Sequence, residues 1–243
     1  MKLKHWIIVV IFLLIVITTV LLDQSYGAIK HLINRRPDSI TIVIDAGHGG
    51  FDPGKVGMNH ILEKDINLSI AYKLKKLLES EDIHVVMTRK DDNGLYKKSD
   101  SDKKRVDMKN RIKIINGSGA AFAISIHQNS YSLETCHGAQ VFYYENSEQG
   151  QVLAEVLQET IKNNLKDGNH RLAKSDSSYY LLRYSSCPLV IVECGFLTNR
   201  REAALLQEDS YQDKIAEAIH LGILEYMKIS MKENNYLNKT PAH

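Results

Sequence analysis

Three short apolar segments constrain the fold of this chain most strongly. They are residues 40–44, 120–126 and 188–192, and each is rich in the β-branched and aliphatic residues of buried strands. Segments with helical periodicity lie between them, among them residues 63–80 and 151–165. Strands that alternate with helices indicate an α/β layer fold. We therefore predict a largely parallel β-sheet with helices packed against it.

The same alternation continues through the rest of the chain. Further strands are predicted at residues 83–88 and 139–144, with a short one at 179–183, and further helices over 106–117 and 211–227. The segment 120–126 is apolar on both faces of a strand, which is typical of a central position in a parallel sheet. No internal repeat is present. One domain, at residues 40–228, therefore accounts for all the predicted elements.

Residues suited to metal chemistry follow each of the three apolar segments. His48 lies on a glycine-rich turn after the first, His127 directly follows the second, and Glu193 directly follows the third. Ligands of parallel sheets bind outside the carboxyl ends of the strands, so these side chains are predicted to meet. Glu63 lies in the first turn of the helix predicted at 63–80 and supplies a second carboxylate.

Two imidazoles and one carboxylate form a ligand set of catalytic zinc sites, which keep a fourth position open for water. A separate carboxylate must then take the proton of the water and pass it to the leaving amine. His48, His127 and the two glutamates supply all these parts. Spacing alone leaves open which glutamate is the ligand and which is the base.

The amino terminus carries an apolar segment, residues 6–22, which contains no charged residue. As a helix it would be roughly 26 Å long at about 1.5 Å per residue, close to the thickness of a bilayer core. We predict a membrane anchor within residues 1–27, with a cleaved signal peptide as the alternative. Both interpretations place the folded part outside the cytoplasmic membrane. Residues 28–39 are interpreted as a tether and residues 229–243 as a polar tail.

Charge excludes one class of function. The formal net charge is only +2, which argues against a dedicated nucleic-acid-binding protein. Residues 90–113 are rich in charges of both signs and are interpreted as a solvated loop that leads into an exposed helix. The same stretch is a candidate contact surface for an anionic polymer.

Five short motifs occur in order along the chain. They are IDAGHGG at 44–50, EKDINL at 63–68, MTR at 87–89, SIHQN at 125–129 and VECGFLTN at 192–199. With these motifs, residues 40–228 resemble the zinc-dependent N-acetylmuramoyl-L-alanine amidases of the third amidase family. The resemblance implies a mixed sheet flanked by helices, like that of zinc exopeptidases. It also implies zinc ligands at His48, Glu63 and His127, a general base at Glu193, and hydrolysis of the amide between muramic acid and L-alanine in peptidoglycan.

Within that family, the chain is most similar to the germination-specific amidases of the spore cortex. The similarity rests on EKD at 63–65, GAQVFYY at 138–144 and YQDKIA at 211–216, on the amino-terminal segment, and on the lack of any wall-binding repeat. This similarity implies that the enzyme catalyses the first step in the formation of muramic-δ-lactam in the spore cortex. The chain departs from the usual family pattern at Gln128, Ser130 and Cys194, which bears on substrate fit. Candidate substrate contacts are Asn129, Arg105 and Arg111, the arginines because they suit a stem-peptide carboxylate.

Regulation is expected to come from outside the chain. Some amidases of this family block their zinc with an inserted helix. Here the interval from His127 to Glu193 is filled by predicted sheet and helix elements, so the site should be open. We therefore expect a sporulation-specific protein partner on the same membrane face, which contacts the last helix or residues 97–113. Two alternative functions remain: an enzymatically silent anchored module that binds peptidoglycan or a partner, and a zinc peptidase that acts on stem peptides.

Overall fold

The computed structural model describes residues 40–57 and 60–237. The predicted anchor or signal segment at residues 1–27, with its apolar run at 6–22, and the predicted tether at 28–39 lie outside the described residues. No helix within the described part has both the length and the apolar character needed to cross a membrane.

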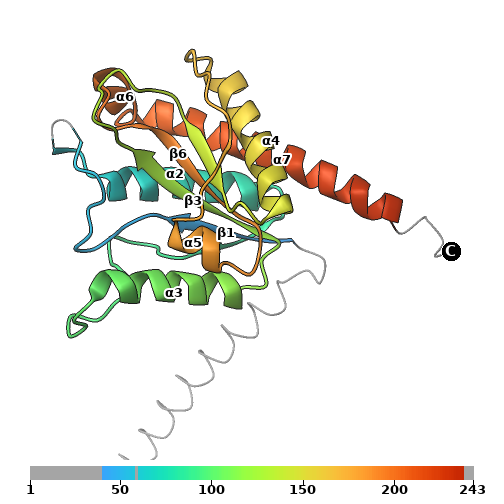
Figure 1. The fold of residues 1–243 in the computed structure, drawn as a ribbon, viewed down its shortest axis with the longest axis horizontal. Coiled ribbons are helices and arrows are strands. Elements are labelled where there is room, and N and C mark those ends of the chain that lie inside the picture. Colours follow the sequence, from blue (N-terminus) through green and yellow to red (C-terminus); the bar gives the residue numbers. More distant parts are fainter. Residues whose placement is uncertain (1–39, 58–59, 238–243) are drawn as a thin grey trace, which may run out of the picture. The chain divides into compact units, whose positions relative to one another are not determined.

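A single six-stranded sheet forms the centre of the described part (Figure 1). The strands lie in the order β2-β1-β3-β6-β4-β5, with β2 at His84–Met87, β1 at Thr41–Ala46, β3 at Phe122–Asn129, β6 at Leu189–Phe196, β4 at Gln140–Tyr143 and β5 at Lys174–Ser175. Every neighbouring pair is parallel except β4 with β6, which is antiparallel. The predicted mixed, largely parallel sheet is confirmed.

The three apolar segments form the middle of this sheet, as β1, β3 and β6. All residues of β1 and β6 are buried, because helices cover both faces of a largely parallel sheet. The register pairs His127 of β3 with Glu193 of β6. The carboxyl ends of these strands therefore bring the two residues side by side.

Helices cover the two faces in separate groups (Figure 1). On one face lie α2 at Glu63–Ser80, α4 at Glu148–Leu165 and α7 at Asp209–Leu237, whose apolar side chains pack with Ile42, Ile44 and Ile124 of the sheet. On the other face lie α3 at Lys103–Gly117 and α5 at Tyr180–Tyr184, which pack against Val43 and Ala123. A short helix, α6 at Arg200–Leu205, follows β6.

The structure corrects the sequence analysis at two places. Residues 179–183 were predicted as a strand, but residues 180–184 form α5. Leu181 and Leu182 both pack into the apolar cluster on one face of the sheet, whereas a strand would point adjacent side chains to opposite faces. The last helix was predicted to end at residue 227, but α7 continues to Leu237, because residues 228–237 contain no glycine or proline to stop it. Neither α6 nor β5 was predicted.

Candidate active site

A cavity of about 400 Å³ opens at the carboxyl ends of β1, β3 and β6. Its wall includes His48, Glu63, His127 and Glu193, which are the four residues that the sequence analysis selected for metal chemistry. Residues of α3 and the segment 179–181 complete the wall. The position agrees with the general rule that α/β sheets bind ligands at this edge.

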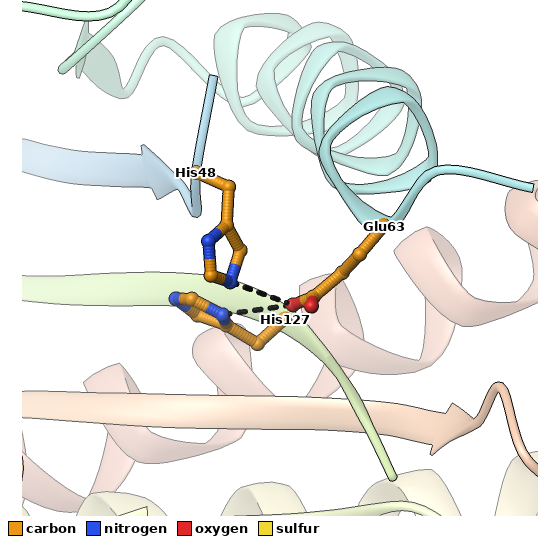
Figure 2. A group of neighbouring side chains, drawn as sticks. All are labelled: His48, Glu63 and His127. Carbon is orange, nitrogen blue, oxygen red and sulfur yellow. Dashed lines mark hydrogen bonds and ion pairs between the residues drawn. The ribbon is translucent and has the colours of Figure 1, made fainter. Parts of the chain in front are cut away.

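His48, Glu63 and His127 form a tight cluster in this cavity (Figure 2). Nε2 of His48 lies 3.2 Å from Oε1 of Glu63, and Nδ1 of His127 lies 3.0 Å from the same oxygen. One candidate ligand atom from each residue lies within 4.8 Å of the other two. The three residues are therefore able to hold one metal ion.

The turn that carries His48 is held in an unusual conformation. Its φ angle is 61°, in the left-handed region that non-glycine residues seldom adopt, and Gly49 and Gly50 follow with positive φ as well. Nδ1 of His48 lies 3.0 Å from a carboxylate oxygen of Asp52. This contact lowers the pKa of Asp52 although burial acts to raise it. Asp52 thus fixes the ring so that Nε2 points toward Glu63.

Glu63 is the first residue of α2, and its side chain is almost completely buried. Oε2 accepts a hydrogen bond from the backbone N–H of Lys55 at 2.7 Å, and Oε1 accepts one from the N–H of Gln128 at 3.0 Å. Burial acts to raise the pKa of Glu63, but the contacts with His127 and His48 outweigh it and hold the pKa far below the usual range. The carboxylate is therefore ionised, as a metal ligand must be.

His127 packs directly on the backbone of Gly47. A Cβ atom added at Gly47 would lie 2.2 Å from Cε1 of the imidazole, so a larger residue at this position would displace the ring. The Gly47 peptide is itself held by three hydrogen bonds. Its N–H donates to the carbonyl of Ile126, and its carbonyl accepts from Arg89 and Asn67. Glycine is required here because the ring approaches the backbone so closely.

The donor set of the cluster fits zinc. Two imidazoles and one carboxylate are the protein ligands of one type of catalytic zinc site, and the rest of the cavity leaves room for water and substrate. An outer carboxylate on a ligating histidine is also typical of zinc sites, and Asp52 occupies this position behind His48.

Glu193 lies beside the cluster but is not part of it. Its side chain is buried, and Oε2 has no hydrogen-bond partner among the described residues. Burial raises the pKa of Glu193 to about 7, although the nearby His127 acts to lower it. A carboxylate with a free oxygen and a pKa near neutrality is suited to take up and release a proton.

A buried ion-pair network lies beneath the turn that carries His48. Arg111 of α3 donates from Nη1 to Asp45 at 2.7 Å and from Nε to Asp107 at 2.6 Å, and from Nη2 it donates to the backbone carbonyl of His48. Asp45 also accepts hydrogen bonds from Thr88 and Ser125. Burial acts to raise the pKa of Asp45, but Arg111 and these hydrogen bonds outweigh it and lower the pKa to about 2. The network therefore fixes the backbone of the turn from below.

The three candidate substrate contacts differ in position. Asn129 and Arg111 line the cavity, whereas Arg105 is exposed on α3 and is not one of the lining residues. The side-chain nitrogens of Arg111 are occupied by the network, so a stem-peptide carboxylate would have to displace one of these bonds. Substrate binding by these residues stays a prediction.

Several residues of the site were not found from the sequence. Asp52 orients His48, and Asn67 donates a hydrogen bond to Glu63. Gln128, noted only as a departure from the family pattern, donates to Asn67 through its side chain. Phe51, Lys104 and Tyr179 line the cavity. Of these, only Asp52 carried a usable signal, because it lies four residues after His48 on the same glycine-rich loop.

The protein is an α/β protein with a cluster of candidate metal ligands at the carboxyl ends of its central strands. A family model described as N-acetylmuramoyl-L-alanine amidase matches residues 42–225. The chain therefore belongs to the N-acetylmuramoyl-L-alanine amidase family and has the activity of that family, which confirms the resemblance seen in the sequence.

Individual relatives agree with this assignment. The germination-specific N-acetylmuramoyl-L-alanine amidase of Bacillus subtilis is 39% identical over 188 residues, which cover 76% of this chain and 78% of the relative. The solved structure of the CwlD amidase from Clostridioides difficile, in complex with the GerS lipoprotein, is 40% identical with a TM-score of 0.77. The match covers 79% of this chain and 100% of that one. The solved structure of the catalytic domain of CwlV from Bacillus (Paenibacillus) polymyxa is 29% identical with a TM-score of 0.68. That match covers 78% of this chain and 98% of the CwlV chain.

Proposed function

We propose that this amidase is zinc-dependent and acts on spore-cortex peptidoglycan, where it removes whole stem peptides from muramic acid as the first step of muramic-δ-lactam formation. The observation that carries the zinc proposal is the cluster of His48, Glu63 and His127 beside the buried Glu193. The cortex role is supported by the 39% identity to a germination-specific amidase.

His48, Glu63 and His127 would hold the zinc ion in this proposal. When bound, zinc supplies the Lewis acidity that makes water a nucleophile near neutral pH. Asp52 keeps the His48 ring oriented, and the N–H groups of Lys55 and Gln128 keep Glu63 ionised and fixed. The protein therefore holds its ligands in place before the metal arrives.

Glu193 is the proposed general base. Its free Oε2 takes a proton from the attacking water and then passes it to the nitrogen of L-alanine as the amide breaks. The products are a stem peptide with a new L-alanine amino terminus and an unsubstituted muramic acid carboxylate. A pKa near 7 suits both directions of this transfer.

We also propose that the enzyme acts outside the cytoplasmic membrane, held there by or exported through residues 6–22, and that a protein partner promotes its activity. The solved CwlD structure contains the GerS lipoprotein, which supports a partner of this kind. The interval between His127 and Glu193 is taken up by β4, α4, β5 and α5, which belong to the sheet and the helices that cover it. The cavity beside the candidate metal ligands is open, with a volume of about 400 Å³. Control by a partner on α7 or on residues 97–113 remains the proposed alternative to an internal plug.

Mass spectrometry of muropeptides tests the proposed reaction. Residues 28–243 are incubated with cortex peptidoglycan, with and without added zinc, and with and without a co-expressed partner. Release of intact stem peptides only in the presence of zinc is the expected result. Cleavage within the stem peptide would favour the zinc peptidase, and no cleavage under any condition would favour the silent binding module.

A further inference from the structure

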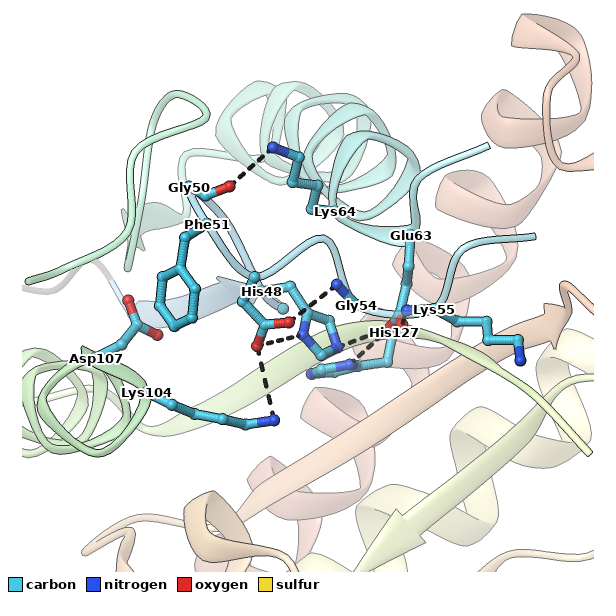
Figure 3. Close-up of polar contacts among 12 residues, drawn as sticks. His48, Gly50, Phe51, Gly54, Lys55, Glu63, Lys64, Lys104, Asp107 and His127 are labelled. Carbon is cyan, nitrogen blue, oxygen red and sulfur yellow. Dashed lines mark hydrogen bonds and ion pairs between the residues drawn. The ribbon is translucent and has the colours of Figure 1, made fainter. Parts of the chain in front are cut away.

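Two parts of the cavity wall differ in chemistry. On the α3 side, the wall contains Phe51, Lys104 and Met108. The segment 179–181, which leads into α5 next to α3, contributes two tyrosines and a leucine to the wall and no acidic or basic residue. Figure 3 shows Phe51 and Lys104 together on the α3 side of His48. The same side also carries Asp107, which is paired with the buried Arg111, and Lys104 is the most exposed charge there.

Lys104 is the exposed cation of the cavity wall among the described residues. Its side chain is 71% exposed, whereas Arg111 is buried within its ion pairs with Asp45 and Asp107. The nearest acid to Lys104 is Asp52, at 3.8 Å, and Asp52 already contacts His48 at 3.0 Å. An exposed pair at this distance contributes little, so Lys104 is available for an anion from solution.

Phe51 forms an apolar surface next to Lys104. Phe51 is 54% exposed, which is uncommon for phenylalanine, yet its position is fixed. Its ring meets the ring of Tyr96 edge-on at 5.1 Å, and its backbone N–H donates to the Tyr96 hydroxyl at 2.8 Å. The ammonium of Lys103 lies 6.0 Å from the ring centre. Phe51 therefore offers a preformed surface on which an apolar group can pack.

We propose that Lys104 and Phe51 form the subsite for the stem peptide, with Lys104 pairing with a peptide carboxylate and Phe51 packing against the aliphatic part of the peptide. This inference rests on the proposed function. Around the scissile amide, the glycan is neutral and the peptide carries the carboxylates. Charge complementarity therefore directs a peptide carboxylate toward Lys104 and leaves the glycan for the part of the wall at residues 179–181, which carries no acidic or basic residue.

Substrate kinetics with Lys104→Gln test the subsite. The substrates are one muropeptide with free stem carboxylates and the same muropeptide with those carboxylates converted to amides. Lys104→Gln should raise KM about fivefold for the acidic substrate, the size expected for one exposed charge pair, with kcat unchanged. It should leave KM for the amidated substrate unaltered. Added salt should reduce the difference, because it screens exposed charges.

Lys109→Gln is the matched control, since it removes the same charge from an exposed position of α3 that does not line the cavity. It should behave as the wild type with both substrates. Phe51→Ala should raise KM for both substrates, because apolar packing does not depend on the carboxylates. An equal effect of Lys104→Gln and Lys109→Gln, or an equal effect of Lys104→Gln on both substrates, would overturn the assignment.

Calorimetric binding of the free, acidic stem peptide gives a second readout that does not require turnover. The peptide should bind the wild-type protein about five times more tightly than Lys104→Gln. If turnover is normal but both measurements show no effect of Lys104→Gln, the subsite is refuted and the proposed function stands. If the wild type cleaves neither substrate, the proposed function fails, and the calorimetric difference alone decides the subsite.

Discussion

Replacement of Gly47 by alanine should disable the metal site and leave the fold intact. The new Cβ would lie 2.2 Å from Cε1 of His127 and 2.3 Å from its Nε2, whereas ordinary contacts are 3.4–4 Å. The ring would have to retreat by about 1.2 Å, the difference between 3.4 and 2.2 Å. The backbone cannot move instead, because hydrogen bonds to Ile126, Arg89 and Asn67 hold the Gly47 peptide.

Metal sites tolerate deviations of only about 0.2 Å in their bond lengths. A shift of about 1.2 Å at one of three ligands should therefore lower zinc affinity by on the order of 100-fold or more, beyond the loss typical of an outer-shell change. Gly47 does not have a positive φ, so alanine is compatible with its backbone conformation. The folded structure should persist, with circular dichroism close to that of the wild type.

Zinc affinity is measured by competition with a chromogenic chelator. Gly117→Ala is the control, because a Cβ at Gly117 would meet nothing within 4 Å. It should bind zinc as the wild type does and be no less stable, since alanine favours helices more than glycine. If folded Gly47→Ala bound zinc within about threefold of the wild-type affinity, His127 would not be a ligand in the way described.

Three further predictions concern acidic residues. Glu193→Gln should keep zinc, measured by elemental analysis, and lose on the order of 10²–10⁴-fold in turnover; loss of zinc would instead make Glu193 a ligand. Asp52→Asn should weaken zinc binding by about 10–100-fold in the chelator competition, because His48 loses its outer carboxylate; unchanged affinity would count against that role. The pKa of Asp45 is lowered from 3.8 to about 2, so its contribution to stability is complete above about pH 4 and is lost as the pH falls toward 2. Asp45→Asn should therefore be less stable than the wild type by at least about 2 kcal/mol at pH 7. Denaturant titrations should show this difference in the free energy of unfolding becoming smaller between pH 4 and pH 2. A difference that does not change with pH would contradict the lowered pKa of Asp45.

The principal residues of the site could be predicted because they follow buried strands. His127 and Glu193 come directly after segments whose composition identifies them as central strands, and parallel packing then forces the two ends together. The role of Glu63 as ligand came from the family resemblance, since its position at the start of a helix is equally compatible with a purely structural role.

The rest could not be predicted because it depends on contacts between segments far apart in the sequence. Arg111 was considered for substrate binding, but its burial against Asp45 depends on how α3 lies on the sheet, which local patterns do not contain. Tyrosine favours strands, so residues 179–183 are predicted as a strand, but the packing of Leu181 and Leu182 against the sheet overrides this preference and gives the helix α5. Asp52 was missed because periodicity says nothing about side-chain direction in a loop.

The parallel pairing of β1 with β3 has a consequence for the order of folding. Ile42 pairs with Phe122, and His48 can meet His127 only after this pairing has formed. Such long-range pairings form slowly, because a long loop must close before any contact compensates its entropy. The metal cluster is therefore expected to assemble late, after the rate-limiting pairing has formed. Added zinc should then slow unfolding and leave the refolding rate nearly unchanged.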